Sequence, residues 1–243
     1  AEVIFIDSDV VVTARWGRSL AGAVRTLRES PVPTVTGAPY RPRDNGTWVE
    51  RAWFAPDPQP SPKGIDGGNL PVLRSTFDAL GGFREELETG EDYDLGTRAR
   101  AAGFRIVQDT ALQAVHLGFP ETLRAFPRRE MRHGQGDFRS LRTFYSSRVA
   151  MASVAGTVAA ITGTILSVCL TTLGPAIVAI GGLTAVAVAS AARRGGFCGG
   201  VSAVIRRILI GHVYVLARTL AVLKVGRGTR NALPTSPTPG ATN

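Results

Sequence analysis

Acidic residues are missing from residues 138–243. All 19 Asp and Glu lie at or before Asp137, so residues 1–137 carry 17 Lys and Arg against 19 acids, whereas residues 138–243 carry 11 with no acid. The net charge of +9 therefore belongs to the apolar C-terminal part. Positive residues that flank membrane segments stay on the cytoplasmic side. This distribution favours membrane lipids, and not nucleic acid, as the partner of the positive charge.

Cysteine is scarce as well. Only Cys169 and Cys198 are present, which excludes a disulfide framework and fits a reducing compartment. The sequence shows no N-terminal signal peptide and no internal repeat. It also lacks an initiator Met and opens almost inside a strand, so we expect it to be a fragment of a longer chain.

Formal charge is absent from Val149 to Ala192, a stretch of 44 residues. One membrane span needs about 20 apolar residues, so this length predicts two spans with a turn at Gly174-Pro175. Arg148 and Arg193 flank the pair and place both ends on the cytoplasmic side. We therefore expect a transmembrane helical hairpin at residues 146–194.

Residues 195–226 are apolar but contain four cations: Arg206, Arg207, Arg218 and Lys224. At about 100° per residue these cations lie within about 120° of one another. A cationic stripe on an apolar helix predicts one that lies in the membrane interface, and a third span is the alternative. Residues 227–243 are rich in Thr, Pro, Gly and Asn, which predicts a disordered tail.

An apolar run, residues 3–6, ends at Asp7-Ser8-Asp9 near the start of the chain. Such a run is typical of a buried strand that is covered on both faces. Strand side chains alternate, so Asp7 and Asp9 should share a face. Two carboxylates on one side suit a divalent cation, which in turn suits a diphosphate. The alternative is that the acids only cap a helix or begin a turn.

Glycine and acidic residues lie at the ends of several helices and strands that we expect in the following segments. We expect helices at residues 18–29, 74–80 and 91–102, and strands at 34–37, 104–107 and 114–117. Residues 39–63 form a long Pro-rich loop whose aromatic residues either wall a cleft or simply pack. Gly67-Gly68-Asn69 permits close approach of a ligand but is also compatible with a plain turn. Glu91 and Asp92 begin a helix, where the dipole alone favours acids.

Basic residues gather between Arg124 and Arg142. They can form a juxtamembrane belt attracted to anionic lipid. They can also bind a diphosphate, because the guanidinium fork matches phosphate oxygens. Both interpretations hold if Arg129 and Arg132 bind phosphate and the later residues face lipid.

Taken in order, these motifs resemble the second half of a membrane-attached, family-2 glycosyltransferase of the inverting GT-A type. The matching segments are Asp7-Ser8-Asp9, Gly67-Gly68-Asn69, Gly81 to Glu85, Gly90 to Leu95 and His116. The resemblance covers residues 2 to about 140. It implies an α/β fold, a partial GT-A (Rossmann-like) mixed sheet with flanking helices at residues 1–145, followed by the hairpin and the interfacial helix.

The resemblance also implies roles for individual residues. Asp7, Asp9 and His116 would hold Mn²⁺ or Mg²⁺ on the diphosphate of a nucleotide-sugar donor. Asp92 would be the general base. Arg129 and Arg132 correspond to a Q/R-x-x-R-W motif on the diphosphate, although His133 replaces its Trp, which argues against processive synthesis. The acceptor path would be lined by Glu91, Gly67, Gly68 and Asn69.

The same resemblance implies that the strands which bind the nucleotide base and ribose normally precede the Asp-x-Asp motif. We therefore expect the chain as given to be weak or inactive alone. The expected partners are a nucleotide-sugar donor, a lipid-linked or envelope glycan acceptor and membrane lipids, with the catalytic part on the cytoplasmic side of a multi-pass membrane protein. Two alternatives remain: a non-catalytic membrane assembly subunit, and a metal-dependent phosphoryl transferase, which would lack a Walker-type loop.

Overall fold

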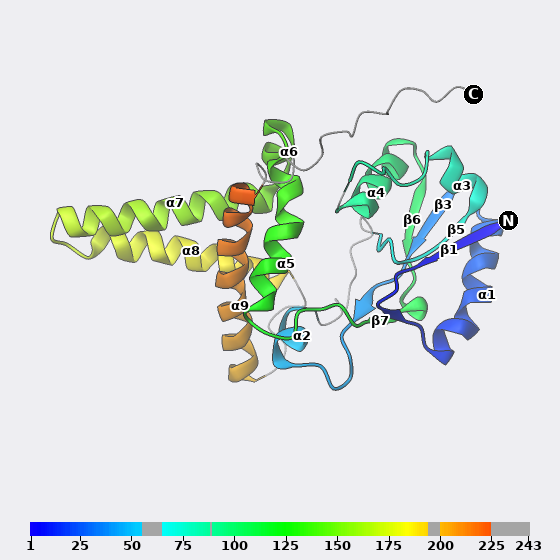
Figure 1. Ribbon diagram of the computed structural model, residues 1–243, viewed down its shortest axis with the longest axis horizontal. Coiled ribbons are helices and arrows are strands. Elements are labelled where there is room, and N and C mark those ends of the chain that lie inside the picture. Colours follow the sequence, from blue (N-terminus) through cyan, green and yellow to red (C-terminus); the bar gives the residue numbers. More distant parts are fainter. Residues whose placement is uncertain (55–64, 88, 194–199, 225–243) are drawn as a thin grey trace, which may run out of the picture.

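The computed structural model describes residues 1–54, 65–87, 89–193 and 200–224. Figure 1 shows an α/β part on one side, a long helical hairpin on the other, and α5 and α9 between them. The expected tail at 227–243 and the stretch 195–199 lie outside the described residues.

A four-stranded mixed sheet forms the centre of the α/β part, in the order β1-β5-β3-β6. Strand β5 is antiparallel to both β1 and β3, whereas β3 and β6 are parallel. The strands are β1 (Glu2–Ile6), β3 (Thr34–Gly37), β5 (Asn69–Leu73) and β6 (Arg105–Gln108). The sequence therefore predicted the strand at 34–37 and nearly the bounds of β6.

The two faces of this sheet carry different helices. Val35, Leu70 and Val72 point to one face, where they pack with Leu95 and Ala99 of α4. Asn69 alternates with Leu70 and faces α1 on the other side, where its Oδ1 accepts a hydrogen bond from Trp16 Nε1 at 2.9 Å. The helices of this part are α1 (Ala14–Glu29), α3 (Arg74–Ala79) and α4 (Glu91–Ala101).

Strand β1 is not buried on both faces, so that prediction was wrong. Val3 and Phe5 pack into the core, but Ile4 and Ile6 on the opposite face are 38% and 43% exposed. The strand lies at the edge of the sheet, and helix α1 packs on β5 and β3, so the outer face of β1 is left largely uncovered.

A second, three-stranded sheet has the order β2-β7-β4, and its first strand follows β1 closely in the chain. Its strands are β2 (Val10–Val11), β4 (Tyr40–Arg41) and β7 (Ala114–His116). Val10 pairs with His116 in this sheet, and the Leu117 N–H donates to Asp9 O at 2.7 Å. The pairing brings His116 next to the residue that precedes β2.

Helix α2 (Trp48–Trp53) interrupts the stretch expected to be a long loop. Its start is fixed by a capping box in which Thr47 and Glu50 satisfy each other's backbone N–H groups. Trp53 packs against Phe126 and Tyr214, with ring centroids 5.5 and 5.0 Å apart. These aromatic residues join the α/β part to α5 (Ala125–Gly134) and α9 (Val201–Leu220).

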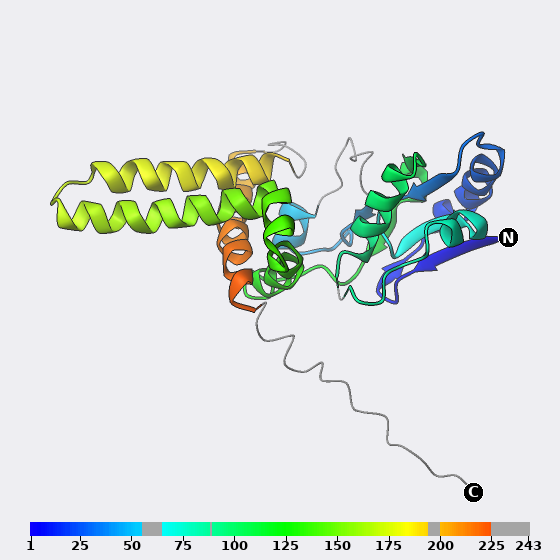
Figure 2. The same ribbon diagram turned by 90° about the horizontal axis from the view of Figure 1, so that it is seen from above.

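The charge-free stretch forms two antiparallel helices, α7 (Arg148–Cys169) and α8 (Gly174–Ala192). Both are long and apolar enough to cross a membrane. In the most apolar 18 residues of each helix, only 17% (α7) and 11% (α8) are buried. The core helices of soluble proteins are mostly buried, so this exposure separates α7 and α8 from them. Figure 2 shows the pair projecting away from the rest of the molecule.

Helix α9 crosses the base of the hairpin and does not run alongside it (Figure 1). Close contact is possible because Gly211 has no side chain: a Cβ there would lie 2.5 Å from Ala187 O. Its cations do not form one stripe, contrary to the sequence-based expectation. Arg207 is only 9% exposed, and Arg218 pairs with Asp137, whereas Arg206 is exposed.

Candidate active site

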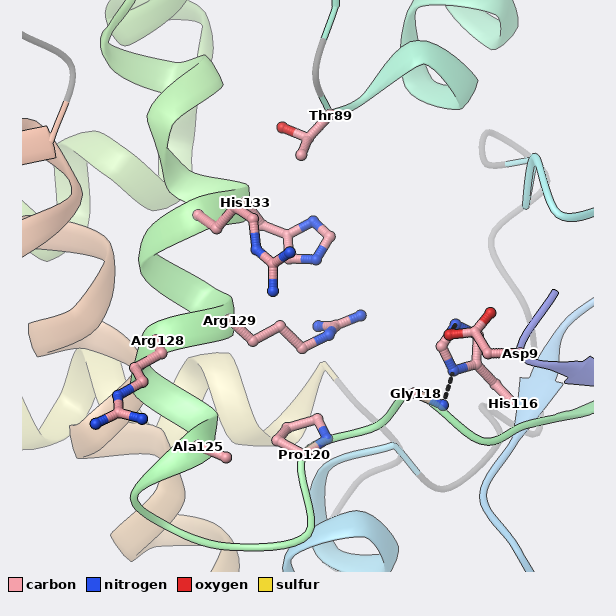
Figure 3. Close-up of a pocket in the computed structure, with 10 residues that line it drawn as sticks. Asp9, Thr89, His116, Gly118, Pro120, Ala125, Arg128, Arg129 and His133 are labelled. Atoms are coloured by element: carbon pink, nitrogen blue, oxygen red, sulfur yellow. Dashed lines mark hydrogen bonds and ion pairs between the residues drawn. The ribbon is translucent and has the colours of Figure 1, made fainter. Parts of the chain in front are cut away.

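A cavity of about 470 Å³ lies between the α/β part and α5 (Figure 3). Asp9 and His116 form one wall, and Arg129, Arg132 and His133 of α5 form the other. Figure 3 shows the side chains of Arg129 and His133 extending toward Asp9 and His116, whereas Arg128 points the opposite way. The cavity thus places an acid and an imidazole opposite a cationic helix, which suits an anionic ligand that also binds a metal.

The Asp-x-Asp motif lies in a turn and does not continue β1. The Val10 N–H donates to Asp7 O at 3.0 Å, which turns the chain immediately after the strand. Strand alternation therefore ends before Asp9, so the expected reason for a shared face does not apply. Both carboxylates nevertheless lie near His116 and Tyr40, whose pKa values the charges of both acids raise. Asp9 lines the cavity, whereas the carboxylate of Asp7 lies against Gly68.

Two glycines make room for these acids. A Cβ on Gly68 would lie 2.0 Å from Oδ2 of Asp7, and a Cβ on Gly118 would lie 2.1 Å from Oδ2 of Asp9. A side chain at either position would force the neighbouring carboxylate to move. Gly118 was not singled out by the sequence, although its position two residues after His116 is a usable signal.

His116 is held by aromatic neighbours on two sides. Its ring stacks on Phe119 at 4.5 Å, and Phe119 in turn stacks on Phe54 at 4.2 Å. Tyr40 meets the imidazole edge-on at 4.9 Å. Nδ1 accepts a hydrogen bond from the Gly118 N–H at 3.0 Å, and Nε2 lies 3.8 Å from Asp9 Oδ2. Burial lowers the pKa of His116 more than the charge of Asp9 raises it.

The described part of the chain places only two side chains, Asp9 and His116, where they could bind a metal in the cavity. Among the described residues, no group of three or more His, Cys, Asp or Glu is arranged to hold a metal ion. Mg²⁺ sites commonly use one or two carboxylates and complete the coordination with substrate phosphates. Asp9 and His116, which face the arginines of α5 across the cavity, fit that kind of site.

Tyr40, which the sequence analysis did not single out, lies near four of the aspartates of this region. Burial raises the pKa of its hydroxyl strongly, and the charges of Asp66, Asp7, Asp92 and Asp9 raise it further. Its buried Oη has no hydrogen-bond partner within the described part of the chain. Tyr40 therefore lies in the common field of four carboxylates that are far apart in the sequence.

Asp92 lies in the first turn of α4, outside the lining of the cavity, and Thr89 of the preceding loop does line it. Burial raises the pKa of Asp92, and the charge of Glu91 raises it further, while hydrogen bonds from the backbone of Tyr93 and Gly67 lower it. Gly67 packs closely against Asp92: a Cβ on Gly67 would lie 3.2 Å from the Asp92 Cβ. The structure thus brings Gly67, Glu91 and Asp92 together.

Asn69 has a structural role, so the expectation that it binds the acceptor was wrong. Its side chain is fully buried, with 0% exposed. Oδ1 accepts from Trp16 Nε1, and Nδ2 donates to Leu112 O at 2.8 Å. Both ends of the amide are occupied in tying α1 and β5 to the loop before β7.

Asp66, just before the glycines, was also missed by the sequence analysis. Burial raises the pKa of its carboxyl to about 7, and the charge of Asp92 contributes to the shift. His133 lines the cavity, and burial together with the charge of Arg129 lowers the pKa of its imidazole. At neutral pH the cavity therefore contains a neutral imidazole beside the arginines.

The sequence profile of the family described as "Glycosyl transferase family group 2" matches residues 57–221. The chain belongs to this glycosyltransferase family. The matched range includes Asp92, His116, Arg129 and Arg132, and extends through the hairpin into α9. It begins after the Asp-x-Asp motif, so the assignment of the family does not depend on Asp7 or Asp9.

No curated protein matches the glycosyltransferase chain significantly in sequence. Among solved structures it is similar to the mannosyltransferase PcManGT from Pyrobaculum calidifontis, in complex with GDP-Man and Mn²⁺, with a TM-score of 0.48 and 17% identity. The alignment covers 93% of this chain and 62% of that chain. The chain therefore spans less than two thirds of the length of this relative.

Proposed function

We propose that this glycosyltransferase transfers a sugar from a nucleotide-sugar donor, with a divalent cation, to a lipid-linked or envelope glycan acceptor. The observation that supports this most is the cavity of about 470 Å³ with Asp9 and His116 on one wall and the arginines of α5 on the other. A diphosphate between these walls would meet metal ligands on one side and guanidinium groups on the other.

In this proposal Arg129 and Arg132 bind the diphosphate. The guanidinium of Arg129 is held 4.9 Å above the ring of Phe54 and bonds Oε1 of Glu130 at 2.9 Å. Because Glu130 is almost fully buried, these contacts fix the direction of the Arg129 side chain. A pre-positioned guanidinium loses less entropy when it binds phosphate.

Asp9 and His116 would hold Mn²⁺ or Mg²⁺, with Asp7 close by. The ion, when bound, would neutralise charge on the nucleoside diphosphate as it leaves. The stacking of His116 on Phe119 and its contact with Tyr40 keep the imidazole in place beside Asp9. Coordination by Nε2 would require the imidazole proton on Nδ1, so the hydrogen bond from the Gly118 N–H would be released when the ion binds. The chain would then supply Asp9 and His116 as ligands, and the diphosphate would supply further oxygen ligands.

Asp92 acts as the general base in this proposal. It takes the proton of the acceptor hydroxyl while that oxygen attacks the anomeric carbon from the face opposite the diphosphate. The bond from the anomeric carbon to the diphosphate breaks in the same step, so the configuration inverts. A carboxyl whose pKa is raised by burial is a stronger base than a solvated one, which suits this task. Glu91 and the backbone of Gly67 and Gly68 lie along the acceptor's path.

Membrane attachment is proposed through α7 and α8, with the catalytic part on the cytoplasmic side. The far half of the hairpin exposes uncharged residues, many of them large and apolar, among them Ile161, Ile165, Val178 and Ile180. Helix α9 adds an exposed apolar stripe formed by Val201, Ile205, Leu209, Leu216 and Leu220. At about 100° per residue these five positions fall within an arc of about 100°, which fits a helix lying in the membrane interface.

The experiment that tests this function uses the full-length protein in detergent. UDP-, GDP- and dTDP-sugars, GDP-mannose among them, are screened with Mn²⁺ for thermal stabilisation and then for sugar transfer to a lipid extract. We expect one donor to stabilise the protein and to release its nucleoside diphosphate only when acceptor is present. Transfer of phosphate without sugar, or no stabilisation by any donor, would contradict the proposal.

The Arg132→Gln variant tests the site itself, with Arg139→Gln as a control of equal charge outside the cavity lining. Loss of a charge-assisted contact to the diphosphate should raise the donor KM of R132Q by about tenfold or more. The donor KM of R139Q should stay close to that of the wild type. Equal donor KM values for R132Q and R139Q would show that Arg132 does not bind the diphosphate.

A further inference from the structure

Three aromatic rings, those of His116, Phe119 and Phe54, form a stack that joins the two walls of the cavity. The Phe119 ring stacks on the imidazole of His116 at 4.5 Å and on the ring of Phe54 at 4.2 Å, and both pairs are nearly parallel, at 17° and 12°. The guanidinium of Arg129 lies 4.9 Å from the centre of the Phe54 ring and 5.8 Å from that of Phe119. The stack thus runs from the proposed metal ligand on one wall to the proposed diphosphate ligand on the other.

Phe119, at the middle of this stack, does not line the cavity itself. Among the described residues, its neighbours Gly118 and Pro120 line the cavity (Figure 3), whereas Phe119 does not and is only 8% exposed. Its ring packs instead in the hydrophobic cluster that joins α2, α5 and α9. Protein cores are close-packed, so the ring cannot shift without moving its neighbours. Phe119 can therefore act on a bound ligand only through the side chains on which it stacks.

The backbone is fixed on both sides of the Phe119 ring. On the N-terminal side, the Leu117 N–H donates to Asp9 O at 2.7 Å. On the C-terminal side, Glu121 pairs with Arg43, which is also bound at 3.1 Å by the fully buried Glu50. Because the segment 117–121 is tied down at both ends, the ring has one defined position in the stack.

The stack does not depend on which nitrogen of the imidazole carries the proton. The hydrogen bond from the Gly118 N–H to Nδ1 of His116 does depend on it, and would be released when Nε2 binds an ion. A contact between parallel ring faces uses neither nitrogen. Phe119 would therefore hold the plane of the imidazole both before and after the ion binds.

We propose that Phe119 is a positioning residue that holds His116 and Arg129 at the spacing which one metal–diphosphate complex requires. This inference rests on the proposed function, which places the metal and the diphosphate at these two walls. One ring outside the cavity lining would thus support the binding of both ligands. Loss of the ring should weaken the binding of the metal and of the diphosphate together.

The test measures the two binding events on the full-length protein in detergent. Mn²⁺ binding is followed by the EPR signal of the free ion at saturating nucleoside diphosphate, and binding of UDP, GDP and dTDP by thermal shift at saturating Mn²⁺. Phe119→Leu removes the ring but leaves an apolar side chain in the core. We expect F119L to raise the dissociation constant of Mn²⁺ by about tenfold and that of the bound nucleoside diphosphate by about fivefold.

Phe77→Leu is the matched control for the loss of a stacked ring. Phe77 also has two ring neighbours, Phe5 at 4.8 Å and Phe83 at 5.2 Å, but it packs against the cluster on the α4 side of the sheet. F77L should lose stability and keep both dissociation constants close to those of the wild type. Phe119→Met, with a flexible apolar side chain, is the second variant if F119L does not fold.

The positioning role is wrong if removal of the Phe119 ring raises only one dissociation constant or neither, or if F77L raises both as much as F119L does. These results require that the wild type binds Mn²⁺ and one of the three nucleoside diphosphates, so they leave the proposed function intact. If the wild type binds neither the metal nor any of the nucleotides, the proposed function and the role of Phe119 fail together.

Discussion

Oδ2 of Asp9 lies 3.8 Å from Nε2 of His116, and Gly118 keeps both groups at the edge of the cavity. The Gly118 N–H bonds Nδ1 of the imidazole, and the missing side chain of Gly118 leaves room for the carboxylate. One residue without a Cβ thus determines the geometry of the pair that we propose to hold the metal.

Gly118→Ala should therefore disrupt this pair. The new Cβ would lie 2.1 Å from Asp9 Oδ2 and 2.8 Å from His116 Cε1, so one or both side chains must move. We expect the Mn²⁺ concentration for half-maximal transfer to rise by about tenfold or more. The control is Gly22→Ala in α1, where a Cβ meets nothing within 4 Å. If G118A needs no more Mn²⁺ than the wild type, Asp9 and His116 do not hold the metal.

The pH profile tests the role of Asp92 as the base. Because the charge of Glu91 raises the pKa of Asp92, Glu91→Gln should lower that pKa. A base acts when it is deprotonated, so the acidic limb of log kcat/KM should move to lower pH in E91Q. The exposed Glu85→Gln variant changes the net charge equally and should leave the limb in place. If the acidic limb of E91Q stays at the same pH or moves to higher pH, the limb reports the titration of a group other than Asp92.

Asp66 gives a prediction about stability. Its pKa is about 7 in the folded chain against 3.8 for an unperturbed carboxyl. The folded state holds the proton more tightly, so this contribution is complete below pH 3.8 and is lost as the pH rises to about 7. Asp66→Asn imitates the protonated form and should be more stable than the wild type above pH 7, by at most roughly 4 kcal/mol.

The measurement for Asp66→Asn is the difference in melting temperature from the wild type at pH 5 and at pH 8. The difference should be larger at pH 8, because only there does the wild type carry a buried charge at this position. Asp44→Asn, whose side chain is 88% exposed, serves as the control and should show no such pH dependence. A constant difference across this range would contradict the raised pKa of Asp66.

Periodicity and charge predicted the elements whose signals are local. The strand at 34–37 and the helical hairpin followed from runs of apolar residues bounded by Gly, Pro and Arg. The hairpin turn lies at residues 170–173, just before the expected position, because Gly174 and Pro175 form the first turn of α8. These features depend on residues that are neighbours in the chain, so the sequence alone carried enough information.

The errors came from contacts between residues distant in the chain. The Asp7 N–H donates to Gly68 O, and Asn69 is buried against Trp16 and Leu112; the periodicity of a strand does not reveal these contacts. The separation of the cations of α9 into different environments depends in the same way on Asp137, which lies in the 3-10 helix after α5 (Gln135–Phe138) and binds Arg218. Such pairings are set by packing and not by the pattern of either segment.

The contact between α5 and the 3-10 turn that follows α9, Ala221–Lys224, gives the last prediction. A Cβ on Gly134 would lie 2.7 Å from the Cβ of Ala221, so Gly134→Ala should push α5 away from this turn. Overpacking of this kind costs about 1–3 kcal/mol. Because α5 carries Arg129 and Arg132, the donor KM should rise along with the loss of stability. Gly136→Ala, two residues away, meets nothing within 4 Å and is the matched control. A G134A variant that is less stable but keeps its donor KM would show that the position of α5 does not control donor binding.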